Sequence, residues 1–173
     1  QHREIPVIFS PGRMEDPAKG MAVLLDAAAI LADEGKKFEV HATLPEGHGG
    51  APWLKAVGKI AHEDIPRAYQ RADICVVPSV WDEPFGLVAL EAMASGLPVC
   101  ASRVGGLQDI VIHEETGLLF ERGSAVSLAT VLGKMLDSTA LCHTLGEAGR
   151  SRVLKTYRWE TILEQYYPSL FHE

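Results

Sequence analysis

The chain alternates between short apolar runs and longer segments whose apolar residues recur every three or four positions. Runs that are apolar on neighbouring residues are typical of strands covered on both faces, as in a parallel sheet. Five such runs predict strands at residues 7–9, 38–40, 74–77, 99–101 and 118–120. Residues 44–52 are rich in Gly, Pro and His and predict an exposed loop.

The longer segments predict helices. Within residues 21–34, Leu24, Ala28 and Leu31 follow the helical repeat, and Gly35 marks the end of the helix. Six segments show a helical pattern: residues 21–34, 64–72, 87–95, 125–136, 141–154 and 159–167. Because strands and helices alternate, the pattern predicts βαβ units and an α/β fold, a three-layer, doubly wound parallel sheet.

Composition narrows the class of protein. A chain of 173 residues fits one domain that can bury a core without a disulfide or a metal. The formal net charge of −7 argues against nucleic acid as the main partner. Three cysteines without a Cys-x-x-Cys pair predict reduced thiols in a cytoplasmic protein, with Cys75 and Cys100 inside apolar runs. No apolar run approaches the ~20 residues that span a bilayer.

The two ends of the chain carry their own expectations. Residues 1–4 are polar and do not begin with Met, so we expect an excised piece of a longer protein. Residues 1–5 are then a linker remnant, and residues 157–173 form a C-terminal helical tail on a single domain that spans residues 1–173. Any peripheral membrane contact of the parent would be made largely by the half outside this chain.

The first candidate loop covers residues 10–20. In doubly wound sheets, ligands bind in loops at the carboxyl ends of the strands. This loop contains Gly12, Arg13 and Lys19 and leads into a helix, whose N-terminus favours an anion. Neither a P-loop nor a GxGxxG fingerprint is present. The loop therefore suits a diphosphate, although a solvated loop with two surface cations stays open as the alternative.

The second candidate loop, residues 81–86, carries Glu83 and leads into a helix in which Glu91 is the one charged residue. A lone carboxylate on an apolar helix costs several kcal/mol unless it is paired or hydrogen-bonded. We expect sugar or ribose hydroxyls to compensate Glu91, with both glutamates facing one crevice. Alternatively, Glu91 caps a neighbouring backbone or pairs with Arg13 or Arg103.

The third candidate loop, residues 102–107, contains Gly105 and Gly106. Two glycines permit close approach of the backbone to a ligand, although an ordinary strand-to-helix turn would use them as well. The three loops converge at one edge of the sheet and offer cations for a diphosphate and carboxylates for hydroxyls. Together they predict a sugar-nucleotide site.

The chain resembles a known family of enzymes. Residues 83–99 resemble the E-x7-E signature of retaining glycosyltransferases of the GT-B fold, family four, also called group 1 glycosyl transferases. The resemblance continues over nearly the whole chain, at residues 12–13, 19–20, 72–79, 104–111 and 116–120. It implies a Rossmann-like domain that forms the C-terminal, donor-binding half of a GT-B fold.

The resemblance also implies a role for each matched residue. Arg13 and Lys19, beside Gly12, hold the donor diphosphate and stabilise it as the leaving group; with Glu83 they form the catalytic set. Glu83 binds hydroxyls of the transferred sugar, and Glu91 binds the ribose. The further donor contacts are made by Phe85, Gly86, Leu87 and Gly105. Transfer proceeds at the front face with retention and needs neither a metal nor another cofactor, because the cations supply the electrostatic stabilisation.

Two departures from the family pattern limit the expectation. The usual Gly-rich end after the second strand reads Ala-Thr-Leu-Pro-Glu-Gly at residues 42–47. We also expect the acceptor-binding N-terminal domain to lie outside this chain. We therefore expect a domain that serves transfer of a hexosyl-type sugar in its parent, but that alone binds the nucleotide and transfers poorly. Two alternatives stay open. One is a sugar-nucleotide epimerase of the same fold, and the other is a non-catalytic nucleotide-binding or interaction module.

Overall fold

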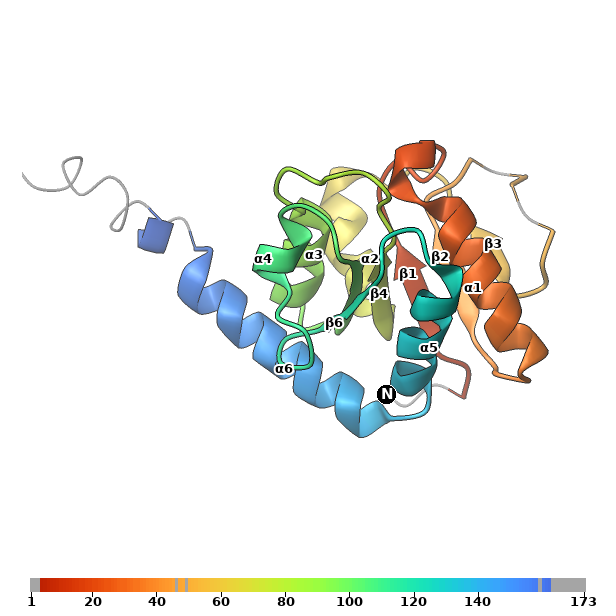
Figure 1. Cartoon of the computed structure of the whole chain (residues 1–173). Coiled ribbons are helices and arrows are strands. Elements are labelled where there is room, and N and C mark those ends of the chain that lie inside the picture. Colours follow the sequence, from red (N-terminus) through yellow and green to blue (C-terminus); the bar gives the residue numbers. More distant parts are fainter. Residues whose placement is uncertain (1–3, 46, 49, 159, 163–173) are drawn as a thin grey trace, which may run out of the picture.

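The computed structural model describes residues 4–45, 47–48, 50–158 and 160–162. Its centre is a six-stranded, all-parallel sheet with strand order β3-β2-β1-β4-β5-β6. The strands are β1 (Val7–Ser10), β2 (Glu39–Ala42), β3 (Leu54–Ala56), β4 (Ile74–Val77), β5 (Val99–Ser102) and β6 (Leu118–Phe120). Helices cover both faces (Figure 1), which confirms the predicted three-layer, doubly wound fold.

The five predicted strands are all present, and β3 is the one that the sequence pattern missed. β3 has three residues, none of them buried, and it pairs only with β2 at the edge of the sheet. Lys55 occupies its centre, so the strand has no apolar run to reveal it. It follows the predicted loop of residues 44–52, whose described residues form neither helix nor strand.

The helices are α1 (Met21–Asp33), α2 (Ile65–Gln70), α3 (Leu87–Ala94), α4 (Leu107–Ile110), α5 (Ala125–Leu136) and α6 (Thr139–Thr156), with 3-10 turns η1 (Pro17–Lys19) and η2 (His62–Asp64). Five of them were predicted. α4 was missed because four residues are too few to show a repeat. Of the predicted tail, residues 160–162 are helical, whereas residues 159 and 163–173 lie outside the described residues, as do residues 1–3 of the predicted linker.

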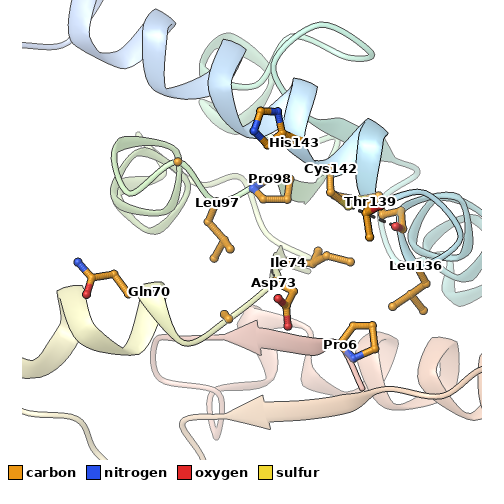
Figure 2. Close-up of a pocket in the computed structure, with 13 residues that line it drawn as sticks. Pro6, Gln70, Asp73, Ile74, Leu97, Pro98, Leu136, Thr139, Cys142 and His143 are labelled. Carbon is orange, nitrogen blue, oxygen red and sulfur yellow. Dashed lines mark hydrogen bonds between the residues drawn. The ribbon is translucent and has the colours of Figure 1, made fainter. Parts of the chain in front are cut away.

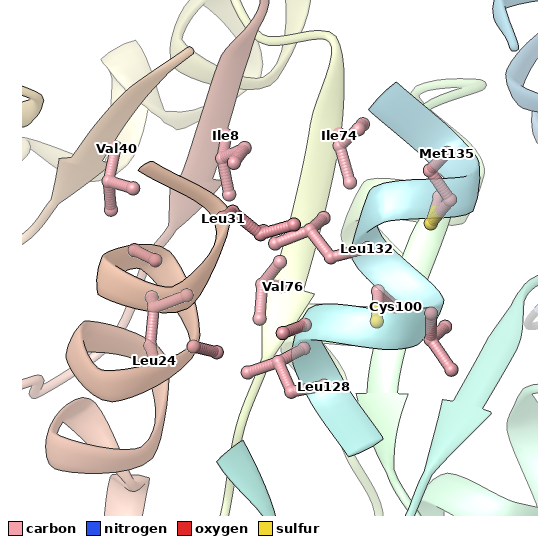
Figure 3. Close-up of a cluster of buried hydrophobic side chains, with 14 of the residues drawn as sticks. Ile8, Leu24, Leu31, Val40, Ile74, Val76, Cys100, Leu128, Leu132 and Met135 are labelled. Carbon is pink, nitrogen blue, oxygen red and sulfur yellow. The ribbon is translucent and has the colours of Figure 1, made fainter. Parts of the chain in front are cut away.

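Helices α1 and α5 cover one face of the sheet (Figure 3). Leu24 and Leu31 of α1 meet Leu128 and Leu132 of α5 over the side chains of the central strands. The opposite face is covered by α2, α3 and α4, with Met93 of α3 fully buried. The sheet therefore lies between two apolar layers. The loops at the ends of its strands are outside these layers and can carry polar site residues.

Helix α6 joins the two layers at the amino-terminal edge of the sheet (Figure 1). Its Leu145 belongs to the apolar cluster beneath α1 and α5, and its Val153 belongs to the other cluster. Helix α6 packs closely against the backbone at Gly96: a Cβ on Gly146 would lie only 2.3 Å from the carbonyl oxygen of Gly96. In the part of the chain that is described, no single helix is long and apolar enough to cross a membrane; α5 and α6 pass that test only as a pair bent by 101°.

The three cysteines are free thiols, as predicted. Cys75 and Cys100 are fully buried on neighbouring strands, and burial raises the pKa of both thiols well above the ordinary value. Cys142 on α6 is half-buried, and burial followed by the nearby charge of Asp73 raises its pKa to about 11. All three thiols are therefore protonated near neutral pH.

Candidate functional site

The candidate site lies where the strand order reverses, between β1 and β4. From β1 the chain runs outward to β2 and β3, and from β4 it runs outward to β5 and β6. At the end of β1, the Ser10 hydroxyl donates to the Val76 carbonyl of β4 at 3.0 Å. The loops that follow these strands also meet, because the Val80 amide donates to the Ala18 carbonyl at 2.9 Å. This is the position at which doubly wound sheets bind ligands.

The loop after β1 is shaped by the turn η1. The Asp16 carboxylate caps this turn by accepting from the Ala18 amide at 2.9 Å, and Gly20 then begins α1 with a φ of 75°. A Cβ on Gly20 would lie only 1.9 Å from the carbonyl oxygen of Pro78. Only glycine fits here. The loop after β1 therefore packs directly against the loop after β4, with Lys19 between them.

Lys19 and Glu83 form the central ion pair of the site. Lys19 Nζ lies 2.6 Å from Glu83 Oε1, and the side chains are 21% and 12% exposed, respectively. The buried Ser79 hydroxyl donates to the same oxygen at 2.7 Å. Burial raises the pKa of Glu83, but hydrogen bonds from Lys19, Ser79 and Trp81 outweigh it and hold the pKa below the ordinary range. The carboxylate is therefore charged at neutral pH.

Two further side chains fix this segment, and the sequence pattern identified neither. The Lys19 ammonium lies 5.3 Å from the centre of the Trp81 ring, within the range of a cation–π contact. Arg122, from the loop after β6, donates to the Val80 carbonyl at 2.7 Å and lies 3.3 Å from Asp82 Oδ1. Arg122 therefore holds the two residues that flank Trp81.

Arg13 does not join the Lys19–Glu83 pair. Its side chain is 77% exposed and lies 3.9 Å from Asp16. Gly12, with a φ of 119°, lines a small hollow together with Lys19 and Glu83. The structure thus brings Gly12, Lys19 and Glu83 together and leaves the Arg13 guanidinium in solvent beside them.

Glu91 lies in a different environment from the one predicted. Leu87, Glu91 and Ala94 form a stripe on α3 that faces solvent, with Leu87 63% exposed, while Leu90 and Met93 face the core. Glu91 is therefore an exposed carboxylate, and the predicted large desolvation cost is wrong. It pairs with neither of the two arginines considered for it.

The partner of Glu91 is Tyr69. The Tyr69 hydroxyl donates to Glu91 Oε2 at 3.0 Å, whereas Arg13 lies beside Asp16, and Arg103 lies 3.4 Å from Glu121. Tyr69 was not predicted as a site residue, because the helical pattern of residues 64–72 does not show which side chain its hydroxyl meets.

The start of α3 offers backbone donors to the site. Gly86, with a φ of 93°, begins the helix, and the first amides bonded within it are those of Ala89 and Leu90, which donate to the Gly86 carbonyl. The amides before them point out of the helix N-terminus. Phe85 and Leu87 carry exposed apolar side chains here. This geometry is available for an anion, and the donor contacts assigned to Phe85, Gly86 and Leu87 stay predictions.

Gly105 and Gly106 support the second loop. The Gly106 amide donates to the Glu83 carbonyl at 2.8 Å, and a Cβ on Gly105 would lie 2.3 Å from that same carbonyl oxygen. The close approach that these glycines permit is therefore made to the backbone of Glu83. A donor contact by Gly105 stays a prediction.

Cavity size does not mark this site. The hollow lined by Gly12, Lys19, Ser79, Glu83 and Val88 has a volume of about 50 Å³. A cavity of about 510 Å³ lies at the opposite edge of the sheet (Figure 2), lined by residues such as Asp73, Leu97, Pro98, Leu136, Cys142 and His143. The larger cavity contains none of the predicted site residues. Because ligand pockets usually measure about 300–1,000 Å³, the hollow forms only one wall of a site for a nucleotide-sized ligand.

Known protein structures share this fold. A solved Anabaena protein in complex with UDP and glucose, HepE, superposes with a TM-score of 0.83 at 25% identity, covering 96% of this chain and 48% of the other. The C-terminal domain of a glycosyl transferase group 1 family protein from Francisella tularensis superposes with a TM-score of 0.74 at 26% identity, covering 90% of this chain and 89% of the other. The predicted resemblance to half of a GT-B fold is confirmed.

Sequence comparison leads to the same family. The D-inositol 3-phosphate glycosyltransferase of Corynebacterium diphtheriae is 35% identical over 172 residues, covering 89% of this chain but 39% of the relative. The chain therefore spans less than half the length of such relatives. The model of the family described as glycosyl transferases group 1 matches residues 2–152. The chain belongs to the group 1 family of glycosyl transferases.

Proposed function

We propose that this chain is the donor-binding half of a retaining glycosyltransferase that moves a hexosyl-type sugar from a nucleoside diphosphate. The observation that carries the proposal is the Lys19–Glu83 pair, 2.6 Å apart, beside the N-terminus of α3 at the switch point of the sheet. A similar fold, that of the Anabaena protein, holds UDP and glucose. The pair sets a cation for phosphate next to a carboxylate for hydroxyls.

The cations would act on the leaving group. Lys19 uses one of its three donors on Glu83, which leaves donors for a diphosphate. The exposed Arg13 guanidinium and the backbone amides at the α3 N-terminus would supply further donors to the same anion. As the bond to the sugar breaks, negative charge grows on the diphosphate, and these fixed positive groups stabilise it without a metal.

The carboxylates would select the sugar and the ribose. Lys19 and Ser79 both bind Oε1 of Glu83, so that Oε2 can accept from a sugar hydroxyl. Glu91 would accept from the ribose hydroxyls. Retention follows from the family resemblance and is tested on the full-length parent by the anomeric coupling constant of the product in proton NMR. Inversion at the anomeric carbon would reject this part of the proposal.

The small hollow bears on what this chain does alone. A volume of about 50 Å³ cannot enclose a nucleotide sugar, so a second wall must complete the site. We expect the chain to bind nucleoside diphosphates weakly and to transfer sugar poorly. The epimerase alternative is not favoured, because no histidine lines the hollow in the described part of the chain.

Titration calorimetry with UDP, GDP and ADP tests the proposal. We expect one diphosphate to bind, and we expect Lys19→Ala to weaken it by roughly 10- to 100-fold through loss of a charge-assisted bond. Lys36→Ala is the matched control, because Lys36 pairs with Asp137 away from the predicted site residues. Equal losses in the two variants, or no binding of any diphosphate at millimolar concentration, would contradict the proposal.

A further inference from the structure

Tyr69 connects the buried layer beneath α2 to the exposed glutamate of α3. Its ring is 2% exposed and packs edge-on against Phe9, with ring centres 5.6 Å apart. Its hydroxyl faces two acceptors, Glu91 Oε2 at 3.0 Å and the Val88 carbonyl at 3.3 Å. One phenolic proton serves one acceptor at a time, and the charged, closer carboxylate is the stronger one.

Glu91 gains a fixed geometry from this bond. An exposed glutamate on a helix surface samples several rotamers, and ordering it costs side-chain entropy. Tyr69 is rigid because its ring is packed in the core, so its hydroxyl holds the Glu91 carboxylate in one orientation. Within residues 4–45, 47–48, 50–158 and 160–162, no second hydrogen bond to this carboxylate is formed, and Oε1 is left to other donors.

Glu91 shares a face of α3 with a residue that lines the candidate site. Glu91 lies three residues after Val88, which places the two on one face of α3. Val88 lines the hollow that contains Lys19 and Glu83. A ligand whose diphosphate lies at Lys19 would therefore extend its next group along this face of the helix, toward Glu91.

We propose that Tyr69 is a positioning residue of the donor site: it holds Glu91 so that one carboxylate oxygen is presented to the vicinal hydroxyls of the nucleotide ribose. This inference rests on the proposed function. It differs from a purely structural role, in which the hydroxyl of Tyr69 satisfies only the core and the Val88 carbonyl. The two roles predict different effects of removing that hydroxyl on ligands with and without ribose hydroxyls.

The test compares two ligands and two hydroxyl deletions. Calorimetry is performed with the best-binding ribonucleoside diphosphate and with its 2′,3′-dideoxy counterpart. We expect Tyr69→Phe to weaken the ribonucleotide by roughly 5- to 10-fold, the loss of about one hydrogen bond, and to leave the dideoxy ligand within twofold. Tyr157→Phe is the control, because the Tyr157 hydroxyl bonds the Asp109 carbonyl at 3.3 Å instead of a carboxylate.

The outcomes separate the inference from the proposed function. Glu91→Ala should give the same ligand-selective loss, and the double variant should lose no more than Glu91→Ala alone. If Lys19→Ala and Glu91→Ala weaken binding while Tyr69→Phe does not, Tyr69 has no positioning role and the donor site still stands. Equal losses for both ligands in Tyr69→Phe would assign the hydroxyl to the core. Failure of the native chain to bind, in contrast, rejects the proposed function.

A second measurement needs no ligand. Carbon-13 NMR of the glutamate side chains reports the order of the Glu91 carboxylate in the free chain. We expect Tyr69→Phe to move the Glu91 carboxylate resonance and to increase its mobility, with the Glu83 resonance unchanged. An unchanged Glu91 resonance in a folded Tyr69→Phe chain would overturn the inference.

Discussion

The large cavity and the switch point of the sheet contrast in volume and in chemistry. The cavity of about 510 Å³ at the amino-terminal edge is lined by apolar residues such as Leu97 and Pro98 together with Asp73 and His143 (Figure 2). The carboxyl-terminal edge has a hollow of about 50 Å³, but it contains Lys19 and Glu83 in a charged network. A further cavity of about 650 Å³, between α1 and the loop after β2, also lacks Lys19 and Glu83. Cavity size therefore does not locate the charged network, which lies where the strand order reverses.

In half of a two-domain fold, charge and close packing locate a site better than cavity volume does. A cleft between two domains loses one wall when a single domain is considered, so its volume is small. The charges and the close-packed glycines remain, because the domain itself must hold them in place. The following predictions test whether the carboxyl edge is built in this way and the amino edge is not.

The largest effect is expected from Gly20→Ala. The new Cβ would lie 1.9 Å from the Pro78 carbonyl oxygen, and the φ of 75° adds strain, so we expect the unfolding free energy to fall by about 3 kcal/mol or more. Gly35→Ala, after α1, has a φ of 80° with nothing within 4 Å and should lose about 1 kcal/mol. Urea unfolding measures both, and similar losses would show that the two loops are not tightly packed together.

An intermediate effect is expected from the titration of Glu83. Because its pKa in the folded chain lies below the ordinary 4.5, its stabilising contribution is present above pH 4.5 and is lost as the pH falls through the folded value. We expect Glu83→Gln to cost about 1 kcal/mol at pH 7 and progressively less as the pH is lowered toward 3.

Glu39→Gln is the control for this pH dependence. Hydrogen bonds from Lys55 and His41 also lower the pKa of Glu39, but this surface carboxylate lies away from the switch point. Its pH-dependent contribution should be the smaller of the two, because solvent screens it more. Urea unfolding between pH 3 and pH 7 measures both, and a larger pH dependence for Glu39 would contradict the special packing of Glu83.

The smallest effect on nucleotide binding is expected from chemical modification of Cys142 at the amino-terminal edge. With a pKa of about 11, Cys142 should react with a disulfide reagent at pH 8 on the order of 100-fold more slowly than a free thiol, and the buried Cys75 and Cys100 should not react in the folded chain. The adduct would partly fill the 510 Å³ cavity. We expect nucleotide affinity to change by less than twofold, and a larger change measured by calorimetry would link the two edges.

The fold could be predicted from the sequence wherever burial on both sides dictated the residues. Strands β1, β4 and β5 are buried at every residue and almost entirely apolar because both faces are covered, and α1 and α5 repeat their apolar residues against one face. β3 and α4 were not predicted because they are short. β3 also has no buried residue and therefore no apolar pattern.

The site could be predicted only in part. Glycines and charges of the strand-end loops marked Gly12, Lys19 and Glu83, but the contacts of Ser79, Trp81 and Arg122 depend on how loops far apart in sequence meet. Glu91 is exposed although its helix is largely apolar, because α3 packs against the core on one side only. Periodicity cannot distinguish an apolar stripe that faces solvent from one that faces the core.

The Lys19–Glu83 pair has a consequence for the kinetics of folding. Its partners are 64 residues apart in sequence, on loops that follow the neighbouring strands β1 and β4. Closing so long a loop is costly before the strands pair, so the anion site does not exist until the central strands have met. We expect a bound nucleoside diphosphate to slow unfolding and to leave the refolding rate unchanged in stopped-flow experiments. For this domain, the nucleotide would stabilise the folded structure after it has formed and would not take part in forming it.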